Sequence, residues 1–134
     1  MSGSGSFAHK LGDILVASAV NSLIAIGHRT GVLRVLFDRV GLPQSLESIA
    51  TVSGKNLRFV TELVHGLICT DVILVKDNTH PLEVYVDEER AAALQSTGIY
   101  CQEIPLLNSC AMTSVEQCFD DGKGLPYSTY PQFS

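Results

Sequence analysis

The segment from residue 11 to residue 28 is apolar on nearly every face that a helix in this position would have. Its large apolar side chains are Ile14, Leu15, Val16, Val20, Leu23, Ile24 and Ile26. A helix that is apolar all round has to be covered all round, and one small domain has little surface to spare for this. The segment therefore predicts a partner surface or a second subunit, and we expect a homodimer through this first helix.

The same segment does not predict a membrane span. Its uncharged apolar stretch runs from Ile14 to Gly27, which is 14 residues, and it contains Ser18, Asn21 and Ser22. A spanning helix needs about 20 apolar residues. We therefore expect the buried helix of a soluble protein that makes no membrane contact.

Composition and cysteine usage favour an ordered domain in a reducing, cytoplasmic setting. The chain has 134 residues, of which 46 % are hydrophobic and 17 % charged, so we expect one domain with a core. The exception is the Gly/Ser-rich segment 1–6, for which we predict disorder. No C-x-x-C pair occurs in the sequence, and a role as small hydrophobic side chains is expected for Cys69, Cys101, Cys110 and Cys118.

Apolar periodicity and capping residues predict the elements along the chain. The expected helices near the middle cover 32–40, 46–53 and 57–68, and their expected N-caps are Thr30, Ser45 and Asn56. The expected later elements are a hairpin with strands over 72–75 and 82–86, a helix from the cap Asp87 to about residue 95, a linker over 96–101, a last helix that starts near Pro105, and an irregular segment over 120–134.

Two helices joined by a tight Gly turn and followed by a hairpin predict a winged helix-turn-helix. The expected fold is mainly α, with a two-stranded β-hairpin, an additional long N-terminal helix and C-terminal helices. We expect a disordered N-terminus over 1–6 and a winged-helix domain over 7–95. A helical linker over 96–134 is expected to lead toward a catalytic domain that this chain does not contain.

The sequence contains no recognisable constellation for catalysis or for metal binding. The histidines are scattered and lack the spacing of metal ligands: they are His9, His28, His65 and His80. The carboxylate pairs 88–89 and 120–121 are adjacent in sequence and so point to different helix faces, and the first pair suits a helix N-terminus. We therefore predict no catalytic residue, no metal site and no cofactor bound by this chain alone.

A helix-turn-helix raises the alternative of a DNA-binding transcription regulator. The outer face of the 57–68 helix and the hairpin turn would offer phosphate contacts from Lys55, Arg58, His65 and Lys76. Residues 71–134, however, hold ten acidic and three basic residues, a net charge of −7, which would repel the nucleic-acid backbone. Nucleic acid is therefore not the expected partner. The regulator stays an alternative, as does a free-standing protein-interaction module.

Segments along the chain resemble, in order, the N-terminal region of certain S-adenosylmethionine-dependent methyltransferases. The similar segments are I-G-H-R-T-G-V-L at 26–33, L-E-S-I-A at 46–50 with Gly54, L-R-F-V at 57–60 through Val72-Ile73, a strand and an acid- and alanine-rich helix at 82–94, and G-K-G-L-P-Y at 122–127 with Tyr130. The resemblance covers nearly the whole chain from Phe7. The chain departs from the family pattern at Leu63-Val64, where Trp is usual, and at Asp71, where Gly is common.

The resemblance implies a non-catalytic N-terminal domain that serves dimerisation and covers the substrate pocket of a methyltransferase. In such proteins S-adenosylmethionine binds to a following Rossmann-like domain, whose Gly-rich loop is expected after residue 134. The cofactor and the catalytic domain in cis are thus expected for the longer parent protein. The tail motif of the family implies that Tyr127 and Tyr130 lie near cofactor or substrate at the domain junction.

Overall fold

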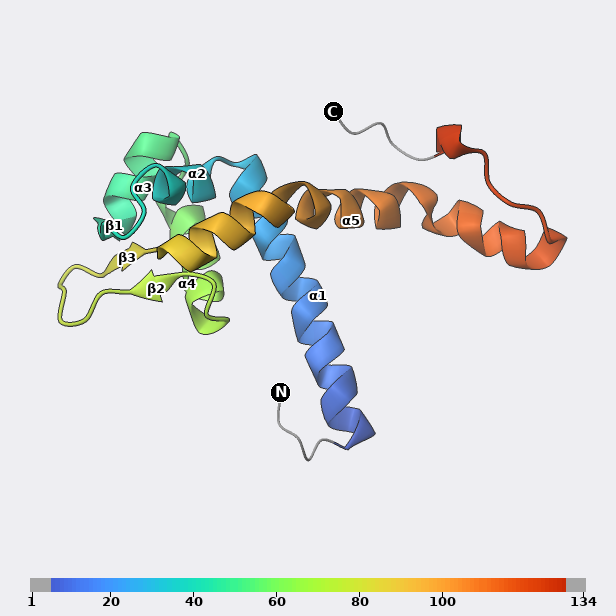
Figure 1. Cartoon of the computed structure of the whole chain (residues 1–134), viewed down its shortest axis with the longest axis horizontal. Coiled ribbons are helices and arrows are strands. Elements are labelled where there is room, and N and C mark those ends of the chain that lie inside the picture. Colours follow the sequence, from blue (N-terminus) through green and yellow to red (C-terminus); the bar gives the residue numbers. More distant parts are fainter. Residues whose placement is uncertain (1–5, 130–134) are drawn as a thin grey trace.

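A computed structural model describes residues 6–129, apart from the side chain of Tyr127. The chain is mainly helical, as predicted, with a small antiparallel sheet and two long helices (Figure 1). The elements are α1 (Phe7–Arg29), α2 (Val32–Phe37), β1 (Gln44–Ser45), α3 (Leu46–Ser53), α4 (Leu57–Cys69), β2 (Leu74–Val75), β3 (Glu83–Tyr85), α5 (Glu88–Asp121) and the short 3-10 helix η1 (Tyr127–Thr129).

Side chains at the predicted caps begin three of the helices. The side chain of Ser45 accepts from the Ser48 N–H, and that of Asp87 accepts from the Arg90 N–H. The side chain of Asn56 accepts from two backbone N–H groups of the first turn of α4. These three cap predictions are confirmed, because each side chain satisfies a donor that the first helical turn leaves without an intrahelical partner.

The predicted cap at Thr30 is confirmed only in part, because its Oγ1 atom accepts from the Val32 N–H at 3.4 Å but Thr30 does not hold the N-cap position. Thr30 instead ends α1, where its hydroxyl donates to the Ile26 carbonyl at 2.7 Å. Gly31, with φ of 82°, is the residue before α2. Because the turn between the two helices passes through a left-handed residue, glycine takes the N-cap position that had been expected for Thr30. The segment predicted to be disordered, 1–6, lies outside the described residues except for Ser6, whose hydroxyl accepts from the His9 N–H.

The sheet has three strands in the order β1-β3-β2, all antiparallel, where the sequence predicted two. Gln44 of β1 pairs with Val84 of β3, and Val75 of β2 pairs with Val84 from the other side. The side chain of Gln44 is buried and donates to the Val35 carbonyl at 3.2 Å. A strand of two residues is too short for an alternating pattern, so it could not be recognised from the sequence.

Helices α2, α3 and α4 and the start of α5 pack with the sheet around one hydrophobic core. We call these elements together the body. The apolar stripe of α4 faces this core, as the three-four repeat predicts. The largest fully buried side chains are Leu33, Leu36, Ile49, Leu67, Ile73, Val32, Val64, Val84 and Val86.

Within a single copy of the chain, most of helix α1 is exposed. Its C-terminal part packs on the body, whereas the side chains from Phe7 to Ala19 are exposed, except at the half-buried Gly12. Only 11 % of its most apolar 18-residue window is buried. Figure 1 shows this N-terminal arm, residues 7–19, extending away from the body. By length and composition alone, α1 is a helix that could cross a membrane.

Helix α5 runs unbroken for 34 residues, so the predicted linker at 96–101 and the predicted helix start near Pro105 are wrong. A proline inside a helix removes the hydrogen bond to the carbonyl four residues earlier, which here is that of Cys101. The side chain of Asn21, from α1, donates to this carbonyl at 3.2 Å. A neighbouring helix thus supplies the donor that Pro105 lacks, and α5 continues. The predicted domain boundary at residue 95 falls within this helix.

Candidate functional site

The exposed apolar surface of the N-terminal arm is the first candidate site. Its largest exposed side chains include Phe7, Leu11, Ile14, Leu15 and Val16. Contiguous exposed apolar surface of this kind marks a site of interaction with a protein or a membrane. The arm carries apolar groups on several faces and has Lys10 and Asp13 among them. This arrangement can bind another apolar surface.

A groove of about 860 Å³ continues from this arm toward the body. One wall is a single face of α1, with residues such as Val16, Val20 and Ile24 at helical spacing. The other wall is the segment 69–71 at the end of α4. Gly66 allows the two helices to approach, since a Cβ atom there would lie 2.9 Å from the Leu23 Cδ1 atom.

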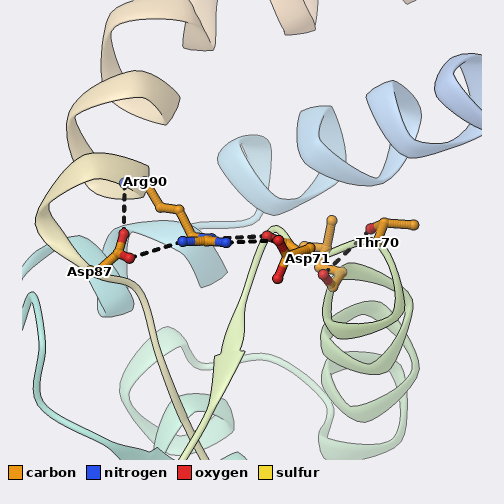
Figure 2. Close-up of polar contacts among 5 residues, drawn as sticks. Thr70, Asp71, Asp87 and Arg90 are labelled. Atoms are coloured by element: carbon orange, nitrogen blue, oxygen red, sulfur yellow. Dashed lines mark hydrogen bonds and ion pairs between the residues drawn. The ribbon is translucent and has the colours of Figure 1, made fainter. Parts of the chain in front are cut away.

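Arg90 fixes the 69–71 wall of this groove. Its Nε–H donates to the Asp71 carbonyl oxygen at 2.9 Å, and another guanidinium nitrogen contacts the Asp71 carboxylate at 2.9 Å. A third contact, also 2.9 Å, joins Arg90 to Asp87 (Figure 2). Asp71 has φ of 64°, a left-handed conformation that costs a residue with a Cβ atom free energy. The planar guanidinium holds both the backbone and the side chain of Asp71 in this conformation.

A second cleft, of about 840 Å³, lies where α1, α2 and α5 meet. The imidazole of His28 lies at this junction against Gly98, where a Cβ atom would come within 2.9 Å of its Cε1 atom. The ring of Phe37 is 5.9 Å from the His28 ring, measured between centroids. The Nε2 atom of His28 is buried and has no hydrogen-bond partner among the residues that the structure describes.

Burial lowers the pKa of His28 below its usual value of 6.5, and a hydrogen bond with the Leu94 backbone opposes this shift. The charged residues that line the same cleft are Arg29 and Arg34 as cations and Asp38 and Glu103 as anions. Arg34 and Asp38 pair with each other at 3.0 Å. Because its Nε2 atom is buried, His28 is not placed to exchange a proton with a molecule in this cleft.

The residues expected as DNA contacts under the regulator alternative are all exposed. Arg58 and His65 lie on α4, Lys55 lies just before α4, and Lys76 follows β2. The Arg58 guanidinium lies 3.6 Å from the carboxylate of Glu62 on the same helix, so part of its charge is compensated. The four side chains are therefore accessible to a ligand.

The two predicted junction tyrosines cannot be placed. Tyr130 lies outside the described residues, and Tyr127 begins η1 but its side chain is outside the description. Among residues 6–129, no group of three or more His, Cys, Asp and Glu side chains is arranged to hold a metal ion.

Sequence reasoning missed the contact between His28 and Gly98 and the groove beside the arm. Gly98 lies in the segment that was expected to be a linker, so its role as a point of close helix approach was hidden. Pro105 could have indicated a continuous helix, because the carbonyl that a mid-helix proline leaves without a partner can accept a hydrogen bond from a side chain such as that of Asn21. No model of a known protein family matches this chain, and no curated protein matches its sequence.

Proposed function

We propose that this chain is a non-catalytic pairing domain that serves dimerisation and covers the substrate pocket of an S-adenosylmethionine-dependent methyltransferase. The observation that carries the proposal is the exposure of the N-terminal arm, where Phe7 is 77 % and Leu15 is 64 % exposed. Each such side chain gains about 1.5–3 kcal/mol when fully buried. A surface of this kind favours a partner.

The arrangement of the body supports the winged-helix part of the proposal. Helices α3 and α4 are joined by a short turn at Gly54, whose φ is 72°, and the β2-β3 hairpin follows them. This is the order of a helix-turn-helix with a wing. The strand β1 before α3 completes the small sheet and fits the same arrangement.

The negative net charge of the chain supports a covering role over a role in nucleic-acid binding. The chain has a net charge of −5, and phosphate contacts need a basic face. In this proposal α5 leads toward the catalytic domain of the parent protein, and S-adenosylmethionine binds to that domain. The resemblance of the 122–127 segment to the methyltransferase junction supports the same direction.

The length of the native polypeptide tests the methyltransferase part of the proposal. An antibody against residues 7–95 is used on an immunoblot of the source cells. We expect a band with room for a catalytic domain of about 150–200 further residues. A band only at the 14.4 kDa of this chain would overturn the methyltransferase assignment and leave a free-standing interaction module.

Two binding measurements on the purified chain sharpen the test. Calorimetry with S-adenosylmethionine is expected to give no heat of binding, and tight binding would overturn the placement of the cofactor site in a following domain.

Titration with duplex DNA at two salt concentrations is expected to give no specific binding. Salt-dependent binding that is lost in Arg58→Ala would favour the transcription regulator instead.

A further inference from the structure

We propose that the junction of α1, α2 and α5 is an acid-sensitive switch, in which protonation of His28 opens the contact between α1 and α5 while the body stays folded. The inference goes beyond the proposed function and does not depend on it. It concerns how the two long helices are joined within a single copy of the chain.

The imidazole of His28 packs against α5 at a position where only glycine leaves room for it. A Cβ atom at Gly98 would lie 2.9 Å from the His28 Cε1 atom and 3.1 Å from its Nε2 atom. The ring of Phe37, at the end of α2, lies 5.9 Å from the His28 ring between centroids. One side chain in the last turn of α1 thus meets both other helices, so a movement of this ring changes the junction.

The two ring nitrogens of His28 have different surroundings. The imidazole makes a hydrogen bond with the Leu94 backbone, whereas Nε2 is buried without a partner among the residues that the structure describes. The N–H of the neutral ring therefore lies on Nδ1, and Nε2 carries a lone pair. A second proton would place a charged N–H on Nε2 where it meets no acceptor, which is unfavourable. The charged ring is therefore stable only after it leaves this position.

The charged groups around the junction do not compensate a second proton on the packed ring. They are Arg29 on α1, Arg34 and Asp38 on and just after α2, and Glu103 on α5. None of them lies within hydrogen-bond distance of Nε2, and Arg34 already pairs with Asp38 at 3.0 Å. A ring that turns out into the cleft meets solvent instead. It also stays in the last turn of α1, where the helix dipole favours a positive charge.

The packing of the core explains why the opening is local. Among the residues that the structure describes, the core cluster includes none from α1, although Leu23 and Ile24 pack against it. Separation of the last turn of α1 from Gly98 therefore leaves the core covered by the elements of the body. The switch is expected to expose little surface.

Hydrogen exchange of the full chain, followed by mass spectrometry, tests the switch. Peptides that cover 20–29 and 94–104 report the junction, and peptides from α4 report the body. After correction for the intrinsic pH dependence of exchange, we expect the junction to exchange about 3 to 30 times faster at pH 5.0 than at pH 7.5. The upper bound is that of an opened imidazole with the usual pKa of 6.5.

Matched variants assign the pH response to one side chain. In His28→Gln the junction exchange is expected to change by less than about twofold between the two pH values. The control His65→Gln removes an exposed imidazole on α4 and is expected to keep the full response. Gly98→Ala, which displaces the packed ring, provides an independent variant. It is expected to speed junction exchange already at pH 7.5 and to reduce the response to acid.

Low urea separates local opening from unfolding of the whole chain. Because the opening exposes little surface, about 1 M urea at pH 5.0 is expected to change junction exchange by less than about twofold, whereas the slowest amides of α4 respond steeply. Junction exchange that rises with urea as steeply as that of α4 would overturn the inference. A pH response that His28→Gln retains would overturn it as well.

Discussion

The side-chain amide of Asn21 in α1 donates to the carbonyl oxygen of Cys101 in α5 at 3.2 Å. This carbonyl lies four residues before Pro105, and the missing N–H of the proline leaves it without a helical partner. One residue of the first long helix therefore compensates for a proline in the second. The contact lies where the two helices cross.

Asn21→Ala is expected to destabilise the fold by about 1 kcal/mol, because the Cys101 carbonyl loses its partner. Pro105→Ala returns the N–H to α5, so the same Asn21→Ala change is expected to cost less in that background. Urea unfolding of the four proteins of this cycle measures the coupling. Equal costs in both backgrounds would contradict the compensation.

Gly98→Ala is expected to destabilise the chain by about 1 kcal/mol, although alanine favours helix over glycine by roughly 0.5–1 kcal/mol. The added methyl group would lie 2.9 Å from His28 Cε1, and overpacking of this kind costs about 1–3 kcal/mol. Once His28→Ala removes the imidazole, the same substitution is expected to stabilise. Thermal unfolding of both pairs tests this change of sign.

The stability of the chain is expected to fall as the pH is lowered below about 6.5, in part because of His28. Burial holds the folded-state pKa of His28 below 6.5. Between the two pKa values the unfolded chain binds more protons, so the free energy of unfolding decreases as the pH falls and levels off below the folded-state value.

The variant His28→Gln isolates this contribution, because its imidazole-free side chain cannot titrate. Urea midpoints at pH 7.5 and pH 5.5 are compared for the two proteins. The decrease is expected to be larger in the unmodified chain. A decrease of the same size in both would show that the buried imidazole does not set this dependence.

Arg90→Lys is expected to lower the urea midpoint of unfolding, because an ammonium group cannot reproduce the forked contacts to Asp71 and Asp87. The matched control is Arg34→Lys, at an exposed pair with Asp38, where a change within about 0.5 kcal/mol is expected. Chemical unfolding measures both. A loss at Arg34 as large as that at Arg90 would contradict the role given to the fork.

The sequence predicted those features that depend on local chemistry. The caps at Ser45, Asn56 and Asp87 were found because each satisfies donors within three residues of itself. The buried stripe of α4 was found because one helix face repeats along it. These signals lie in single segments and need no knowledge of the tertiary arrangement.

Apart from the cap expected at Thr30, the errors concern contacts between distant segments. β1 exists because Gln44 meets Val84, forty positions further along the chain, and α5 passes through Pro105 because Asn21 lies beside it. The apolar sequence of α1 indicates that the helix packs against another surface, but it does not identify that surface. The apolar surface of the arm was predicted from the sequence as a partner surface. The groove beside it could not be predicted, because one of its walls is the segment 69–71, which only the folded chain brings next to α1.

The crossing of α1 and α5 also determines how the chain responds to tension. The hydrogen bond from Asn21 to Cys101 joins residues 80 positions apart, and the whole body lies between them in sequence. A pulling force applied to the two ends therefore acts first on the contacts that α1 makes with α5 and with the body. The helices are expected to separate before the sheet and its core unfold. The crossing therefore yields first under tension, and the body unfolds later.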